Sequence, residues 1–411
     1  MRRKVWSILM MLTIATTVWA QQKPKWAEEV DKLQVEINES RKQKQWSKLS
    51  DCMAKQEQVF YSHPEEERIK HIGISELSSN FYYNLACYSS LAGKVSRALK
   101  AFEKYTQMAV NKETEVNFIH IQSDTDLDPI RNTKRFKVCL EKLRPLGDQI
   151  QKLKDASGYQ KGSAPESLRF RYMEPNDSNL VMLRQHYNLD SIAGAGDELS
   201  KIKNLLHWVH ETVRHDGSSS NPQVKNTRAM IELCRKENRG VNCRMMAQML
   251  AEVYLAMGFK ARFVTCMPRD FINDCHVITT VYSCTLNKWL WVDPTFDAYV
   301  TDENGTMLSI AEVRTRLRKG QEVRLNDYAN WNHQSKQTKE HYIDYYMAKN
   351  LYYIACMEES RFNAETWEKG RNYRYFILMP YKEVDKEIVG IGREYIRFTD
   401  ADWFWQSPYE K

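Results

Sequence analysis

One stretch of the chain is apolar on nearly every side of a helix, and this stretch most restricts the fold. Asn242 is a favourable N-cap and Gly258 a favourable stop, so the pattern predicts a helix between them. The only polar line along it consists of Arg244, Gln248 and Glu252. A helix with so little polar surface is normally enclosed by its domain. We therefore expect a buried central helix whose first turn holds Cys243.

Two strand patterns follow this helix. Residues 276–283 alternate with the two-residue period of a strand, and His276 opens the run. Residues 288–293 form a second such run, which Asp293 closes. The four residues between the runs suit the loop of an antiparallel hairpin. The sequence therefore predicts a helix followed by paired strands, which is an α+β arrangement.

The length of the hairpin loop decides whether the histidine and the aspartate share a face. With four loop residues, Ser283 faces Lys288. Ile278 then faces Asp293, and His276 is the diagonal neighbour of Asp293 on the same face. A loop with an odd number of residues would place the two side chains on opposite faces. With the even loop, we expect the imidazole and the carboxylate to lie within reach of each other.

Together with Cys243, these two residues predict a nucleophilic cysteine site. The free amides and the dipole at a helix start stabilise a thiolate and lower its pKa from about 8.5. His276 would take the thiol proton and later give it to a leaving amine, while Asp293 would fix the tautomer of the imidazole. Each residue taken alone also fits a structural interpretation: a core cysteine, a half-buried strand histidine and a turn aspartate before proline.

Other candidate side chains are weaker. Cys275 lies on the strand face opposite the histidine, which makes it a poor alternative nucleophile. Core packing is the simplest use of Cys266. His207, His210 and His215 lie on or just after a predicted helix, and no carboxylate or cysteine at ligand spacing accompanies them. We interpret these histidines as structural or site-bordering, and we predict neither a metal site nor a cofactor.

The region before this core, residues 21–155, shows helix patterns only. One part of it resembles a tetratricopeptide repeat, in which small residues let two helices pack closely. The residues with this spacing are Tyr82, Leu85, Ala86, Ala98 and Phe102. A generic helical bundle explains the pattern equally well. Either way, we expect a module that spaces domains or binds a protein partner.

Amino-acid composition predicts the remaining domain boundaries. A stretch rich in Ser, Gly, Lys and Pro around residues 155–166 predicts a linker, which separates the helices from a core at 166–325. Residues 326–411 form an extension dense in aromatic side chains. Its predicted strands lie at residues 352–354, 375–378 and 395–398. We expect its final Trp-Phe-Trp, residues 403–405, to pack on the core.

The N-terminus predicts export. Met1–Ala20 combines a charged start, an apolar run too short to span a bilayer and a small residue at the cleavage position. We expect a periplasmic or extracellular protein without a stable membrane anchor. Loss of this segment lowers the formal net charge from +7 to +4, which is too weak to favour nucleic acid. Nine cysteines permit disulfides after export, and the sequence leaves their pairing open.

Taken together, these segments resemble the transglutaminase-like superfamily. The resemblance rests on residues 208–210, 214–217, 240–258, 261–264, 275–277, 289–295, 299–303 and 308–313. It implies a papain-like α+β core, with the cysteine on a helix start and the histidine and aspartate on an antiparallel sheet. It also implies a triad of Cys243, His276 and Asp293. Two features of relatives have no visible counterpart: the calcium sites of animal transglutaminases and the zinc knuckles of peptide N-glycanases. A second oxyanion donor is not identifiable.

The resemblance and the residues together predict an exported cysteine enzyme that attacks peptide, glutamine or isopeptide amide bonds through a thioester. Water or an amine would resolve the thioester, and dilute surroundings favour hydrolysis over cross-linking. The alternative is a non-catalytic binding or scaffold protein that uses the helical repeat and a transglutaminase-like groove.

Overall fold

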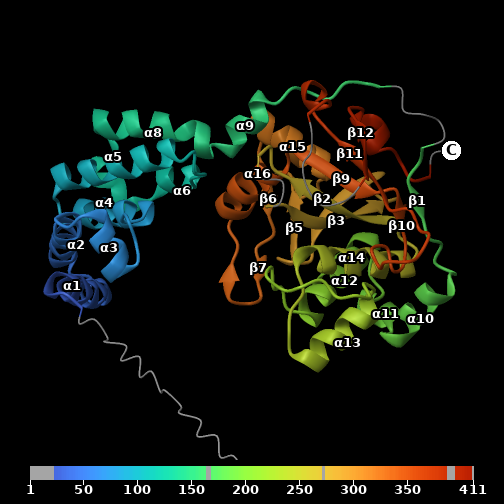
Figure 1. Cartoon of the computed structure of the whole chain (residues 1–411). Coiled ribbons are helices and arrows are strands. Elements are labelled where there is room, and N and C mark those ends of the chain that lie inside the picture. The colour runs from blue at the N-terminus through green and yellow to red at the C-terminus, as the bar shows by residue number, and fades with distance from the viewer. Residues whose placement is uncertain (1–22, 163–167, 271–273, 387–393, 410–411) are drawn as a thin grey trace, which may run out of the picture. The chain divides into compact units, whose positions relative to one another are not determined.

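A computed structural model describes residues 23–162, 168–270, 274–386 and 394–409 (Figure 1). The chain divides into two compact units, one formed by residues up to 114 with 124–143, and one formed by residues 115–123 with 144 onward. The predicted signal peptide, Met1–Ala20, lies outside the described residues. Within the described ranges, no helix is both long and apolar enough to cross a bilayer.

The first unit consists of helices, as predicted. They are α1 (Lys25–Lys42), α2 (Trp46–Tyr61), α3 (Glu65–Ile72), α4 (Ser79–Leu91), α5 (Val95–Asn111), a 3₁₀ turn (Thr125–Leu127), α7 (Asp128–Arg131) and the start of α8 (Lys134–Gly147). A short turn containing Gly93, whose φ is 72°, joins α4 to α5. All five residues of the predicted repeat are buried between these helices. The assignment to tetratricopeptide repeats stays a prediction.

The second unit is built around an eight-stranded sheet with the order β12-β11-β9-β2-β3-β4-β5-β6. Its strands are β2 (Ala261–Met267), β3 (His276–Ser283), β4 (Lys288–Asp293), β5 (Ala298–Thr301), β6 (Arg324–Leu325), β9 (Tyr353–Met357), β11 (Arg374–Leu378) and β12 (Glu394–Phe398). All neighbours are antiparallel except β11 and β12. Two small pairs stand apart: β1 (Arg171–Tyr172) with β10 (Glu359–Ser360), and β7 (Asn330–Trp331) with β8 (Ser335–Lys336). This confirms the α+β class.

Helices cover both faces of the sheet. The strands carry apolar side chains on both faces, so each face needs a covering layer. One face packs against α10 (Ser178–His186), α11 (Leu189–Ala193), α12 (Glu198–Thr212), α13 (Thr227–Glu237) and α14 (Cys243–Ala256). The other face packs against α9 (Gln149–Asp155), α15 (Ile310–Lys319), a π-helix (Glu340–Met347) and α16 (Ala348–Asn350). The remaining short helices are α6 (Phe118–Ser123), a 3₁₀ turn (Tyr381–Glu383) and α17 (Ala401–Phe404).

The predicted central helix is α14, and the structure buries even its polar line. Arg244 donates to Glu365 and to Thr265, and Glu252 accepts from the backbone and hydroxyl of Thr227. These partners offset part of the cost of enclosing the charged groups, although burial still raises the pKa of Glu252 to about 7.

The aromatic extension completes the same sheet, since β9, β11 and β12 all follow residue 326. Phe404 is fully buried, as expected for the Trp-Phe-Trp tail. The tail also packs on the guanidinium of Arg262, which lies 5.6 Å from the ring centre of Phe404 and 5.3 Å from that of Trp405. Phe170 and Trp289 lie closer to it, at 4.0 and 4.2 Å. Such cation–π contacts stabilise a charge that is nearly out of water.

Candidate active site

The start of α14 places Cys243 at the first helical position. The side chain of Asn242 caps the helix by accepting from the backbone N–H of Met245 at 3.2 Å. Directly upstream, Val241 pairs with His215, and a Cβ on Gly240 would lie 2.4 Å from the carbonyl oxygen of Arg214. Only glycine permits this approach. The close pairing brings the segment around His215 beside the helix start.

His276 and Asp293 meet as the predicted register requires. Ser283 pairs with Lys288 and Thr279 with Val292, so the hairpin loop has four residues. His276 Nε2 lies 2.6 Å from Asp293 Oδ2, and both side chains are buried. With Nε2 engaged, Nδ1 is the ring nitrogen available to the cysteine.

The carboxylate of Asp293 is held entirely by donors. Its Oδ2 accepts from the hydroxyl of Tyr342 at 2.6 Å as well as from the imidazole, and its Oδ1 accepts from the backbone N–H of Thr295 at 2.9 Å. Tyr346, from the same π-helix as Tyr342, packs with its ring centre 5.1 Å from that of His276. Both tyrosines come from the aromatic extension, and no sequence pattern pointed to them.

The environment of Cys243 favours its thiolate. Burial alone raises the pKa of the thiol, but hydrogen bonds from His215 and His276, the charge of His276 and the backbone N–H of Val277 outweigh it and lower the pKa to about 5. The side chain remains partly exposed, as a reactive thiol must be. Burial alone would lower the pKa of His276, but Asp293 and Cys243 raise it to about 10. The pair therefore rests as thiolate and imidazolium.

Alkylation should report this ion pair. Because iodoacetamide reacts with thiolates, we expect Cys243 to label at a nearly constant rate from pH 9 down to about pH 6, with half the maximal rate near pH 5. Burial raises the pKa of Cys275 and, to about 11, that of Cys356, so these thiols should label only in strong base. The measurement is peptide mapping after timed labelling. Simultaneous labelling of all three would contradict an activated thiol.

His215 is the site residue whose role the sequence did not specify. Its Nδ1 accepts from the indole N–H of Trp331 at 2.9 Å, and its backbone N–H donates to Asn332 at 2.8 Å. An imidazole whose Nδ1 accepts carries its hydrogen on Nε2. That N–H is then the donor to the sulfur of Cys243. Gly240 and the family resemblance over residues 214–217 are the sequence signals that could have indicated this neighbour.

The other side chains considered from the sequence lie elsewhere. Cys266 is fully buried in β2, and burial raises its pKa well above the usual range. No disulfide joins any of the nine cysteines, all of which fall within the described residues. His207 contacts Asp297, with 2.7 Å between Nδ1 and Oδ2. His210 is buried beside Pro294, directly after Asp293.

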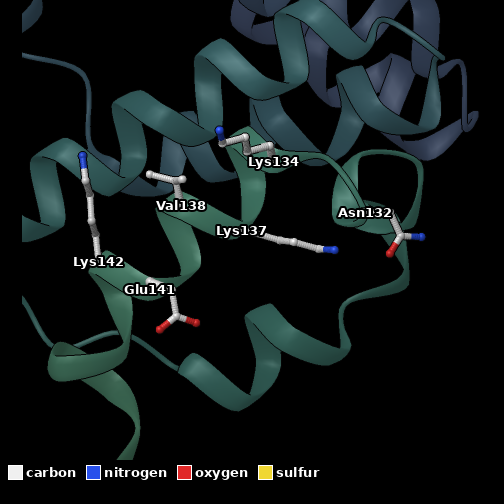
Figure 2. A pocket seen from close by; sticks show the side chains of 6 residues that line it. All are labelled: Asn132, Lys134, Lys137, Val138, Glu141 and Lys142. Carbon is white, nitrogen blue, oxygen red and sulfur yellow. The ribbon is translucent and has the colours of Figure 1, made fainter.

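The helical unit carries a surface cavity of about 600 Å³ on α8 (Figure 2). Its lining consists of Asn132, Lys134, Lys137, Val138, Glu141 and Lys142. Val138 is 47% exposed between these mostly basic side chains. The lining contains no thiol, hydroxyl or imidazole side chain, so this surface suits binding better than catalysis.

One comparison with known proteins, the family model, agrees with the geometry of the second unit. The family model of the transglutaminase-like superfamily matches residues 185–294, a segment that contains the cysteine, the histidine and the aspartate. No curated protein matches the chain. A solved structure described as a "Putative Cysteine Protease from Cytophaga hutchinsonii" is 19% identical, with a TM-score of 0.24. The match covers 31% of this chain and 42% of that protein, which is less than half of its length.

Proposed function

Because residues 185–294 form a transglutaminase-like core, we propose that this protein is an exported cysteine enzyme that breaks amide bonds through a thioester. Peptide, glutamine and isopeptide bonds are the substrate class. The observation that carries the proposal is the contact of one thiol with an imidazole that is itself bound to a buried carboxylate. This is the arrangement in which a cysteine is activated by a base and the base is oriented by a third group.

The residues divide the reaction among them. The thiolate of Cys243 attacks the amide carbon and forms a C–S bond. His276 then donates its Nδ1 proton to the nitrogen as the C–N bond breaks, which releases the amine and leaves a thioester. In the second half, His276 removes a proton from water, the resulting hydroxide attacks the thioester, and the thiolate leaves. Asp293 keeps the imidazole in one orientation throughout.

His215 supplies a fixed hydrogen-bond donor in this mechanism. Trp331 occupies its Nδ1, so its Nε2–H points permanently at the reacting sulfur and its surroundings. A neutral imidazole can stabilise developing negative charge as an N–H donor. We assign it the role of second oxyanion donor, beside the backbone N–H groups at the start of α14.

Substitution of His215 tests this role. We expect His215→Ala to lower kcat by about 10²–10³-fold with little change in KM, because removal of one oxyanion donor has this effect. His215→Gln retains an amide N–H and should retain more activity than the alanine variant. Steady-state kinetics on one peptide substrate would measure both. Wild-type kcat in His215→Ala would show that the donor is dispensable.

Hydrolysis is the favoured outcome, because an exported enzyme meets water in large excess over dilute amines. Incubation with a peptide library and mass-spectrometric readout separates the possibilities: new termini indicate peptidase activity, glutamine-to-glutamate conversion indicates deamidation, and cross-linked pairs indicate transamidation. The matched control is Cys243→Ser. Product formation that is equal with the variant, or no product with any peptide, would contradict the proposal.

We further propose that the helical unit binds a protein partner. The basic cavity on α8, whose lining includes the exposed Val138, suits an acidic segment that carries an apolar side chain (Figure 2). In the alternative function, a non-catalytic scaffold, this binding would be the only activity. Partner binding would then be unaffected by Cys243→Ala, and the wild-type protein would turn over no amide.

A further inference from the structure

A second polar cluster lies where the end of α12 meets the β7–β8 hairpin. It contains His210 and Glu211 from α12 and His333 from the hairpin turn. One nitrogen or oxygen of each side chain lies within 4.8 Å of the corresponding atoms of the other two. The amide oxygen of Asn330 lies 3.3 Å from Nε2 of His210 and adds a fourth donor atom. The proposed amide chemistry uses none of these four side chains.

Both ring nitrogens of His210 face oxygen atoms. The side-chain amide of Asn330 is oriented by two bonds: its Nδ2 donates to the carbonyl of Tyr328 at 3.1 Å, and its Oδ1 accepts from the backbone N–H of His333 at 2.7 Å. Oδ1 therefore faces Nε2 of His210, while Nδ1 faces the carbonyl oxygen of Pro294 at 3.0 Å. A neutral imidazole has one N–H. It cannot donate to both oxygens, so one ring nitrogen is left with a lone pair beside an oxygen atom, an arrangement that a bound metal ion would satisfy.

Two contacts in the cluster are close to the spacing of neighbouring ligand atoms around a metal ion. In a tetrahedral zinc site, bonds of about 2.0–2.1 Å hold neighbouring ligand atoms about 3.3 Å apart. His333 Nε2 lies 2.9 Å from Glu211 Oε1, and the contact between His210 and Asn330 is 3.3 Å. An Nδ1–H that donates to a backbone carbonyl, as at Pro294, is the usual outer contact of a metal-bound histidine.

We propose that His210, Glu211, His333 and Asn330 form a binding site for a divalent transition-metal ion of the zinc class. Two imidazole nitrogens and two oxygens are a donor set that such ions accept. The carboxylate supplies one compensating negative charge. His210 is 5% exposed and forms the floor, whereas the side chains of His333 and Glu211 are 62% and 40% exposed and leave a route for entry.

Such an ion would connect two parts of the active site. His333 and Asn330 belong to the hairpin segment that also carries Trp331, the donor to His215. His210 holds the carbonyl of Pro294, the residue after Asp293. Metal binding would therefore fix this hairpin against α12 and stabilise the surroundings of both catalytic imidazoles. The ion itself takes no part in the amide chemistry.

The test is Co²⁺ titration of the tag-free full chain, followed by the visible d–d absorption of the bound ion and by competition with Zn²⁺. The protein should carry Cys243→Ala, because the thiolate and His276 would otherwise compete for the metal. We expect one equivalent of Co²⁺ with a low-symmetry spectrum that Zn²⁺ abolishes. Adding His333→Ala or Glu211→Gln should weaken binding at least about 10–100-fold, the effect that loss of even an outer partner has.

The matched control is His186→Ala, which removes an exposed histidine on α10 and should leave the titration unchanged. Absence of a Co²⁺ spectrum, or a spectrum and affinity that persist in His333→Ala, would overturn the proposal. Because the readout is metal binding in a protein without the nucleophile, the result is independent of whether the amide chemistry is correct.

Discussion

Cys243→Ala is expected to lower amide turnover by about six orders of magnitude, the loss seen when a nucleophile is removed from a catalytic triad. Alanine leaves no group that can form the thioester. The fold should persist, because the side chain is small and partly exposed. Turnover of a cleaved library peptide, measured with a fluorogenic derivative, would quantify the loss, and circular dichroism would verify the fold.

The matched control for this variant is Cys284→Ala, since Cys284 is an exposed thiol in the β3–β4 loop. It should retain wild-type turnover. His276→Ala should lose nearly as much activity as Cys243→Ala, and the double variant should lose little more than either, because the two groups act as one unit. Additive losses, or turnover within tenfold of wild type in Cys243→Ala, would exclude the thiol as nucleophile.

The sequence predicted those features best whose determining residues lie close together along the chain. The cap at Asn242, the strand starting at His276 and the parity of the hairpin loop are local, and the structure agrees with all of them. The pairing of His276 with Asp293 spans 17 residues and follows from that parity. Local periodicity was therefore enough to bring the imidazole and the carboxylate together.

The groups that surround this pair come from distant segments. Tyr342 reaches Asp293 across 49 residues, and Trp331 reaches His215 across 116. Neither contact can be predicted from hydrophobic periodicity. Each depends on where the segment after β6 packs against the core. The same holds for the buried Arg244, whose partner Glu365 lies 121 residues away. The sequence showed a polar line on a buried helix but not the side chains that satisfy it.

Asp293→Asn should lower kcat by about 10⁴-fold, although it preserves the shape of the side chain. All three contacts of this carboxylate come from donors: the imidazole, the hydroxyl of Tyr342 and the backbone N–H of Thr295. An amide NH₂ must face at least one of them. If it faces His276, the imidazole becomes an acceptor at Nε2 and carries its hydrogen on Nδ1 as a neutral ring. It then cannot take the thiol proton, and it stabilises a thiolate only as a neutral N–H donor, without the positive charge of the imidazolium.

Tyr342→Phe is the matched comparison, because it removes one donor from Asp293 and leaves the bond to His276 intact. A hydrogen bond to a charged group is worth about 1.5–3 kcal/mol, so turnover should fall by about 10- to 150-fold, well short of the loss in Asp293→Asn. Steady-state kinetics and the alkylation rate of Cys243 at pH 7 should be measured on both variants. In Asp293→Asn the alkylation rate should also fall, because the imidazolium that lowers the pKa of the thiol loses its counter-charge. Equal and small effects of the two variants would mean that His276 is oriented by packing against its aromatic neighbours, with no need for the carboxylate.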